Sequence, residues 1–174
     1  GYVAAAVGPE RRTTLLIGGR RTYFEPIFAL LRAINVVGPY FLTPQFGELY
    51  GRAVFRPNDH NRVRFSAVFT DDLISFEESD EDDEDPLFEV KGKLRMKNRV
   101  FITHADWIWD APGGGDLHTT LSYMTDRSSR DRQGAFDLRD DTRFQRLGLR
   151  SDGRIRVAHN NRLSVGLDLG WVEM

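Results

Sequence analysis

The feature that most constrains the fold of this chain is a strict alternation of apolar and polar residues. It is clearest near the C-terminus, where every second residue is apolar (Leu163, Val165, Leu167, Leu169 and Trp171). Residues 62–70 and 146–157 alternate likewise, with arginines on the polar parity. Because successive side chains of a β-strand point to opposite faces, this alternation predicts strands with one apolar and one polar face.

Read along the whole chain, the alternation predicts about eight strands. They cover residues 2–8, 13–23, 46–56, 62–76, 98–110, 117–126, 142–157 and 162–173. The connections between them alternate between short and long. Pro57–Asn61 and Ala111–Asp116 are short turn sequences, whereas Glu77–Lys97 and Arg127–Asp141 are long. A further long connection contains an apolar stretch, Pro26–Val37, that predicts a short helix.

This alternation of loop lengths bears on the fold class. Outer-membrane barrels have tight turns on the periplasmic rim and long loops on the extracellular rim, whereas a soluble β-sandwich has no reason to gather its long loops at one end. The pattern therefore favours an all-β fold, a meander of antiparallel transmembrane β-barrel strands. The apolar set between Leu163 and Trp171 is then expected to face lipid. A soluble sandwich, whose charged face meets water, is the alternative.

The composition excludes several other classes of protein. The chain has 174 residues, of which 40% are hydrophobic, and its mean hydropathy is −0.44. No stretch approaches the roughly 20 apolar residues of a spanning helix, which excludes a helical membrane protein. The formal charge of −2 gives no reason to expect nucleic acid as a partner. The absence of cysteine excludes disulfides and thiolate metal sites.

Aromatic residues are expected in two belts at the strand ends, because amphipathic rings sit at headgroup depth. One group lies beside the short turns (Phe55, Trp107 and Trp109). The other falls toward the opposite strand ends (Tyr23, Phe46, Tyr50, Tyr123, Phe144 and Trp171). The alternative interpretation is that aromatic residues are simply common in strands.

The strands are expected to form part of a larger barrel. The first residue already lies at a strand, and the last strand ends at Val172–Met174 rather than in the usual terminal aromatic residue. The inward parity is rich in glycine and arginine, which suits a wide lumen better than a tightly packed interior. We therefore expect residues 1–174 to be a single, incomplete barrel segment whose edges, 2–8 and 162–173, do not bond each other.

Several short motifs carry a family resemblance. In order they are Gly1–Val3, Gly18–Tyr23, Gln45–Tyr50, Asn61–Ser66, Thr70–Asp72, Thr119–Tyr123 and Leu147–Asp152. Together they resemble the first strands of TonB-dependent outer-membrane receptors, whose barrels have about 22 strands. The resemblance implies nutrient transport across the bacterial outer membrane, with a plug domain and the TonB energy-coupling system as partners. Neither a plug nor a TonB-binding segment is among these residues. A scaffold barrel subunit without transport is the alternative, and a soluble binding module a third.

Residues that suggest chemistry have simpler interpretations. The acidic run Glu77–Asp85 offers oxygen ligands for a hard cation or a cationic partner, but it lacks the spacing of a calcium loop and is typical of a solvated surface loop. Of the four histidines, His60 and His159 lie in predicted turns, and His118 follows another turn. His104 shares a face with Asp106, which would orient its imidazole.

The remaining candidates are pairs and runs of like residues. Asp71–Asp72 and Asp140–Asp141 are adjacent carboxylates, and adjacent strand residues point to opposite faces. Gly113–Gly115 lacks the lysine and helix of a phosphate loop. Arg20–Arg21 sends one guanidinium to each face, the inward one toward a plug carboxylate. We therefore expect no catalytic, cofactor-binding or metal-binding residue, and no enzyme.

Overall fold

The computed structural model describes residues 1–7, 12–22, 24–34, 43–77, 92–134, 137–158 and 161–174. It is all-β apart from one helix, α1 (Glu25–Ala33), which has proline in its first turn, where the missing N–H costs no hydrogen bond. The strands are β1 (Tyr2–Val7), β2 (Thr13–Arg21), β3 (Thr43–Asn58), β4 (Asn61–Glu77), β5 (Gly92–Ala111), β6 (Gly115–Gly134), β7 (Leu138–Ala158) and β8 (Asn161–Glu173).

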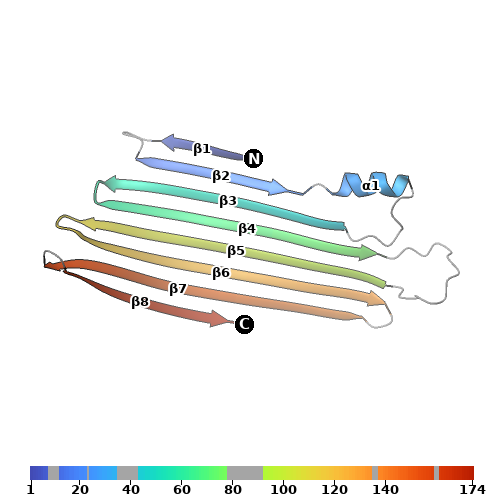
Figure 1. Cartoon of the computed structure of the whole chain (residues 1–174). Coiled ribbons are helices and arrows are strands. Elements are labelled where there is room, and N and C mark those ends of the chain that lie inside the picture. The colour runs from blue at the N-terminus through green and yellow to red at the C-terminus, as the bar shows by residue number, and fades with distance from the viewer. Residues whose placement is uncertain (8–11, 23, 35–42, 78–91, 135–136, 159–160) are drawn as a thin grey trace.

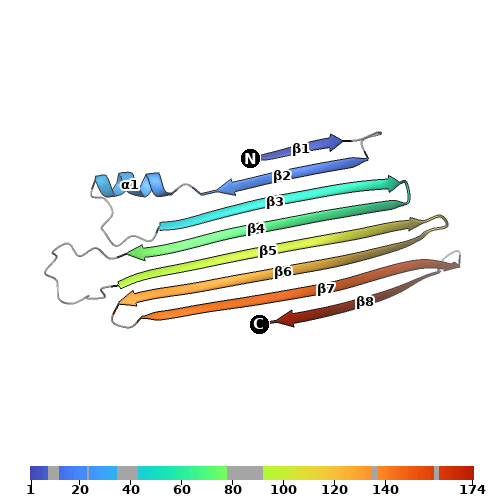
Figure 2. The ribbon, with the colours of Figure 1, turned by 180° about the vertical axis from the view of Figure 1, so that it is seen from behind.

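The strands form one antiparallel meander in which each pairs with its neighbours in sequence, in the order β1 to β8. Figure 1 shows a single layer with β1 and β8 at opposite edges and α1 beyond the end of β2. The view from behind gives the same arrangement (Figure 2). Within the described residues β1 pairs with β2 alone and β8 with β7 alone. The expectation that these edges do not bond each other is confirmed.

Two turns are described at the end of the sheet opposite α1. Asp59 and His60 join β3 to β4, where the Asn58 side chain accepts from the His60 amide at 3.1 Å and so closes the turn. Pro112–Gly114 join β5 to β6, and Gly113 and Gly114 have φ of 119° and 89°, which side chains disfavour. These turns lie where the sequence predicts them, and the glycine run 113–115 ends the β5–β6 turn and begins β6.

The register divides the side chains between two faces. Directly opposite residues share a face, and in all seven pairings their numbers have the same parity over the regular parts of the strands. Odd-numbered residues of β1 to β8 therefore form one face, here called the odd face, and even-numbered residues the even face. A set of successive cross-strand partners is called a row.

The odd face is the apolar one. Among the described strand residues, four exposed large apolar side chains lie on the even face: Tyr2, Phe46, Leu138 and Val172. Twenty lie on the odd face: Val3, Leu15, Ile17, Leu49, Phe55, Val63, Phe65, Phe69, Trp107, Trp109, Leu121, Leu147, Leu149, Ile155, Val157, Leu163, Val165, Leu167, Leu169 and Trp171. Leu163, Val165, Leu167, Leu169 and Trp171 thus share one face of the sheet, as their alternation predicts, and the contact of that face with lipid stays a prediction.

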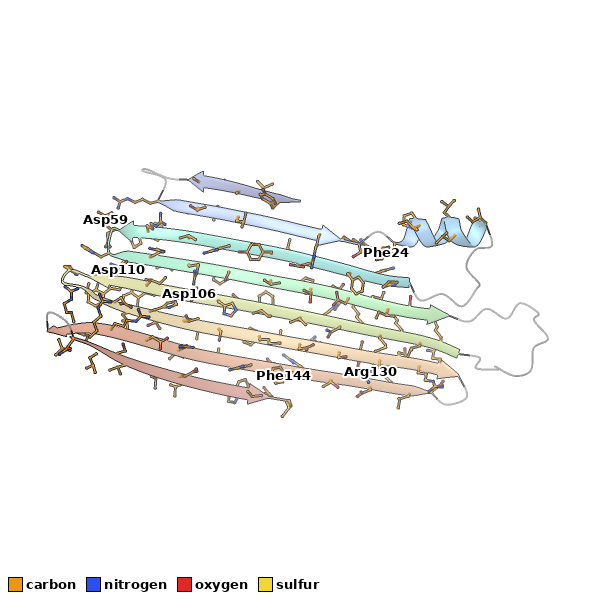
Figure 3. All side chains as sticks on the ribbon, viewed as in Figure 1. Phe24, Asp59, Asp106, Asp110, Arg130 and Phe144 are labelled. Atoms are coloured by element: carbon orange, nitrogen blue, oxygen red, sulfur yellow. The ribbon has the colours of Figure 1, made fainter. Side chains whose placement is uncertain are left out.

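The described part of the molecule has no buried apolar core. None of its hydrophobic side chains is buried, and the one buried polar residue is Asp106, 6% exposed. Figure 3 shows the side chains along one layer of strands, which is the single sheet of the described residues. The described helix is not long and apolar enough to cross a membrane. Because folding depends on removing apolar surface from water, the odd face requires cover from outside these eight strands.

Two predictions of loops are wrong. The segment Arg127–Asp141 is largely strand, because β6 continues to Gly134 and β7 begins at Leu138. Likewise β5 begins at Gly92, inside the predicted loop Glu77–Lys97. The extension of β6 and β7 carries polar residues on both faces, so cross-strand backbone pairing forms it without an alternation of hydropathy. The extension of β5 does alternate, with Lys93, Arg95 and Lys97 on one face and Leu94 and Met96 on the other, a signal that the sequence prediction missed. The helix predicted within Pro26–Val37 is confirmed as α1.

The second aromatic belt is only partly as predicted. Tyr123 and Trp171 lie on the odd face, but Phe46, Tyr50 and Phe144 have even numbers and lie on the even face. Tyr23 lies outside the described residues. Phe69 and Phe101, which are direct cross-strand partners, lie on the odd face instead. Phe55, Trp107 and Trp109 lie on the odd face near the turns, as expected.

Candidate functional site on the even face

The most enclosed group of polar side chains lies on the even face around Asp106. Cross-strand pairing aligns Arg64 of β4, Asp106 of β5, Thr120 of β6 and Arg150 of β7 in one row. Asp106, labelled in Figure 3, lies toward the end of the sheet that carries the turns. The site is therefore built by register: four residues far apart in sequence become neighbours because their strands pair.

Both oxygens of the Asp106 carboxylate are engaged. Arg64 Nε donates to Oδ2 at 2.6 Å, and Thr120 Oγ1 donates to Oδ1 at 2.7 Å. His118 Nε2 lies 3.3 Å from the same Oδ1 and 3.3 Å from Thr120 Oγ1. An ion pair and a hydroxyl donor together compensate a carboxylate that is largely removed from solvent.

The imidazole beside Asp106 is not the one expected from the sequence. His104 does share the even face with Asp106, two residues away on β5. The histidine in contact with the carboxylate is His118 of β6, which lies diagonally across the strand pair. Spacing along one strand does not reveal this contact, because it depends on the pairing of β5 with β6.

A second ion pair, formed within β7, extends the site toward β8. Arg150 Nε donates to Asp152 Oδ2 at 2.7 Å, and Asp152 is the direct cross-strand partner of His118. On β8, a Cβ added at Gly166 would come within 2.9 Å of Asp152 Oδ1, so glycine lets this carboxylate lie over the strand. The surrounding hollow has a volume of about 710 Å³ and is lined by Asp116, His118, Thr120, Arg150 and Asp152, among others.

The other candidates from the sequence do not join this group. Arg20 lies on the even face, and its Nε donates to Glu48 of β3 at 2.7 Å. Asp71 lies on the odd face, where it accepts from Arg99, and Asp141 accepts from Arg139. No three histidine or acidic side chains of the described ranges are grouped so that they would hold a metal ion.

Two of the expected sites are not covered by the structure, and a third is a turn residue. The acidic run beyond Glu77 and the residue His159 lie outside the described residues. His60 is an exposed turn residue. The even-face site is thus a set of paired charges beside a hollow, an arrangement that offers both donors and acceptors to water or to a polar partner.

Comparison of the chain with protein-family models, with curated protein sequences and with solved structures found no match in any of the three.

Proposed function

We propose that this chain contributes eight consecutive strands to a transmembrane β-barrel of the bacterial outer membrane, with the odd face toward lipid and the even face toward the lumen. The observation that carries the proposal is a band of uncharged odd-face residues across β4 to β7. Its boundary rows are Asn61–Trp109–Leu117–Gly153 and Phe69–Phe101–Thr125–Gln145.

The height of this band matches a bilayer. It spans residues 61–69 of β4 and their partners, a length close to the roughly 9–11 residues of a tilted membrane-spanning strand. On β4 to β7, every residue of the row directly beyond the band is charged: Asp71, Arg99, Arg127 and Arg143. A charge at the middle of a bilayer is costly, and so an abrupt change from uncharged to charged rows is expected at a membrane surface.

The ends of the band carry the aromatic residues. Trp109 lies in one boundary row, with Trp107 in the next row inward. Phe69 and Phe101 lie in the other boundary row, and Trp171 is one row inward at that end. Rings at both ends of an apolar band support two membrane interfaces.

The even face supports a hydrated lumen. It carries the paired charges of Arg64, Asp106, Arg150 and Asp152, which would be unsuitable against lipid. In a soluble protein the odd face would instead need a second apolar sheet, and no hydrophobic side chain of the described strands is buried against one. We propose further strands beyond β1 and β8, since each unpaired backbone group in hydrocarbon costs several kcal/mol.

We propose transport as the activity of this barrel, as part of a TonB-dependent transporter for nutrient uptake. The support is the resemblance of its motifs to those receptors and the charged even face, on which a plug domain with its own charged groups would dock. The Asp106 site and its hollow of about 710 Å³ are the proposed lumenal contact region, without a catalytic step. A scaffold barrel without transport is the competing function, since charged lumenal faces are common to both.

Two measurements test this proposal. The full chain should remain in the outer-membrane fraction after extraction with urea at high pH, and its release by that treatment would contradict the barrel. For transport, cells with and without the chain should be compared for depletion of nutrients from the medium, each with an intact or a disrupted TonB system. Depletion that needs both the chain and TonB supports the transporter. Stable insertion without any such depletion would favour the scaffold.

A further inference from the structure

The charged row next to the uncharged band has an unusual composition. Arg99 of β5, Arg127 of β6 and Arg143 of β7 are successive cross-strand partners, and all three lie on the odd face. Lys97 lies one row further out on the same face. These four residues span two adjacent rows and are here called the basic row; they lie in the half of the sheet away from the turns at Asp59 and Pro112.

Within the described ranges, one carboxylate is in ion-pair contact with the basic row. Asp71 Oδ1 accepts from Arg99 Nε at 2.9 Å and lies 3.7 Å from Lys97 Nζ. Asp141, which also lies nearby, is paired with Arg139 at 3.2 Å. Among the described residues no carboxylate is in ion-pair contact with Arg127 or Arg143, so the basic row has more positive than negative charge.

The contact that Arg143 makes is with a neutral group. When the Gln145 amide is turned so that its nitrogen donates to Tyr123 Oη at 3.0 Å, its oxygen accepts from the Arg143 guanidinium at 3.1 Å. This contact orients the guanidinium and leaves its charge uncompensated. Tyr123 and Gln145 belong to the uncharged band, so the contact also ties Arg143 to the edge of that band.

Like charges directly opposite each other destabilise a strand pair. Arg99 faces Arg127 and Arg127 faces Arg143, with Cβ atoms of such partners typically about 5 Å apart. An anion held between the guanidinium groups converts this repulsion into attraction, and phosphate suits the planar donors of arginine. The surface is hollowed there, with a volume of about 310 Å³ lined by Lys97, Arg99, Arg127, Ser129 and Arg143, among others.

We propose that the basic row binds the phosphate-bearing, net-anionic headgroup of a membrane lipid. The inference rests on the proposed function, because it needs the odd face to contact lipid. It goes further by naming a ligand for one place on that face. A lipid is chosen rather than a soluble phosphate compound because the basic row lies beside the uncharged band. The row adjoins the uncharged band directly, so a headgroup bound by the arginines has its acyl chains over Phe101 and Leu121.

The test uses the complete protein, including the further strands proposed beyond β1 and β8. It is reconstituted into phosphatidylcholine vesicles with or without a minor fraction of lipid A, whose phosphate groups serve as the probe. Insertion is scored by protease protection, and binding by the lipid A retained per protein after transfer to detergent. The test variant is Arg99→Gln/Arg127→Gln/Arg143→Gln. The matched control, Arg130→Gln/Arg132→Gln/Arg146→Gln, removes the same charge from the even face of the same part of the sheet.

We expect both variants to insert like the wild type. Retained lipid A should fall by roughly tenfold or more in the test variant and remain unchanged in the control. Arg127→Lys/Arg143→Lys should retain part of the binding, because the charge is kept while bidentate donation is lost.

Other outcomes overturn the inference or the proposed function separately. Wild-type protein that inserts but retains no more lipid A than the test variant overturns the inference and leaves the barrel intact. If inorganic phosphate, added alone as a competitor, removes the retained lipid A from the wild-type protein, the choice of a lipid is overturned. Wild-type protein that inserts into neither kind of vesicle contradicts the proposed function itself, and the inference with it.

Discussion

The guanidinium of Arg64 on β4 donates to the carboxylate of Asp106 on β5 at 2.6 Å, directly across the strand pair. The exposed fractions of the two side chains are 33% and 7%. The most buried residue of the described sheet is therefore charged, while large apolar side chains such as Phe65 and Leu167 are about half exposed on the other face. Apolar side chains are usually the most buried ones, so this distribution is consistent with apolar cover from outside these eight strands.

The Arg64–Asp106 pair should be measurable as a coupling energy. We expect Asp106→Ala to lower the free energy of unfolding by about 1–3 kcal/mol, because Arg64 and Thr120 lose their acceptor in a partly enclosed site. Arg64→Ala should cost a similar amount. The double variant should cost less than the sum, by about 0.5–3 kcal/mol. Urea unfolding in vesicles measures all four proteins. If the loss of the double variant equals the sum of the two single losses, the Arg64–Asp106 ion pair has no coupling energy.

A charge should be tolerated on one face of β8 and rejected on the other. Leu169 belongs to the central row of the uncharged band, with Leu149, Leu121 and Phe65. Leu169→Arg should therefore destabilise the inserted protein by about 2–4 kcal/mol. Gly170→Arg is the matched control, since a Cβ at Gly170 meets nothing within 4 Å on the even face. The measurement is the folded fraction in vesicles over a urea series, and equal damage from the two variants would exclude the assignment of faces.

The two ends of the sheet should be accessible from different sides of the membrane. The chain has no cysteine, so a single introduced cysteine is a unique label site. Asp137→Cys, between β6 and β7, should react with a membrane-impermeant maleimide in intact cells. Asp59→Cys, in the turn between β3 and β4, should react only after the cells are broken. Both positions are exposed, so burial does not separate them. Reaction of Asp59→Cys in intact cells would contradict the proposed topology.

The tryptophans should report their depth in the bilayer. The chain has three, at positions 107, 109 and 171, so single-tryptophan proteins need only two Trp→Phe replacements each. Trp109 lies in the boundary row of the band and Trp107 one row inward. Lipids brominated near the headgroup should quench Trp109 more than Trp107, and lipids brominated deeper in the chain should reverse that order. Fluorescence of all three tryptophans that is insensitive to brominated lipid would favour a soluble sheet.

Much of the fold follows from local pattern. The alternation around Leu163–Trp171 predicts both a strand and the face on which its apolar side chains lie, because the two faces of a strand are set by parity alone. The turns at Asp59 and Gly113 follow from residue types that favour tight connections. Strands β1 to β8 were therefore predictable in number and order, as was the segregation of charge from apolar residues.

The remainder depends on which residues become cross-strand partners, and that is a non-local property. The stretch Arg127–Asp141 carries no hydropathy alternation, yet β6 and β7 continue through it because the hairpin satisfies its own backbone hydrogen bonds. The choice of His118 rather than His104 as the partner of Asp106 follows from the pairing of β5 with β6. The alignment of Arg99, Arg127 and Arg143 follows likewise from the register of three strands. A shift of one residue would send each side chain of a strand to the opposite face. The need to keep the apolar residues of every strand on one common face therefore selects the register, and the register in turn builds the sites.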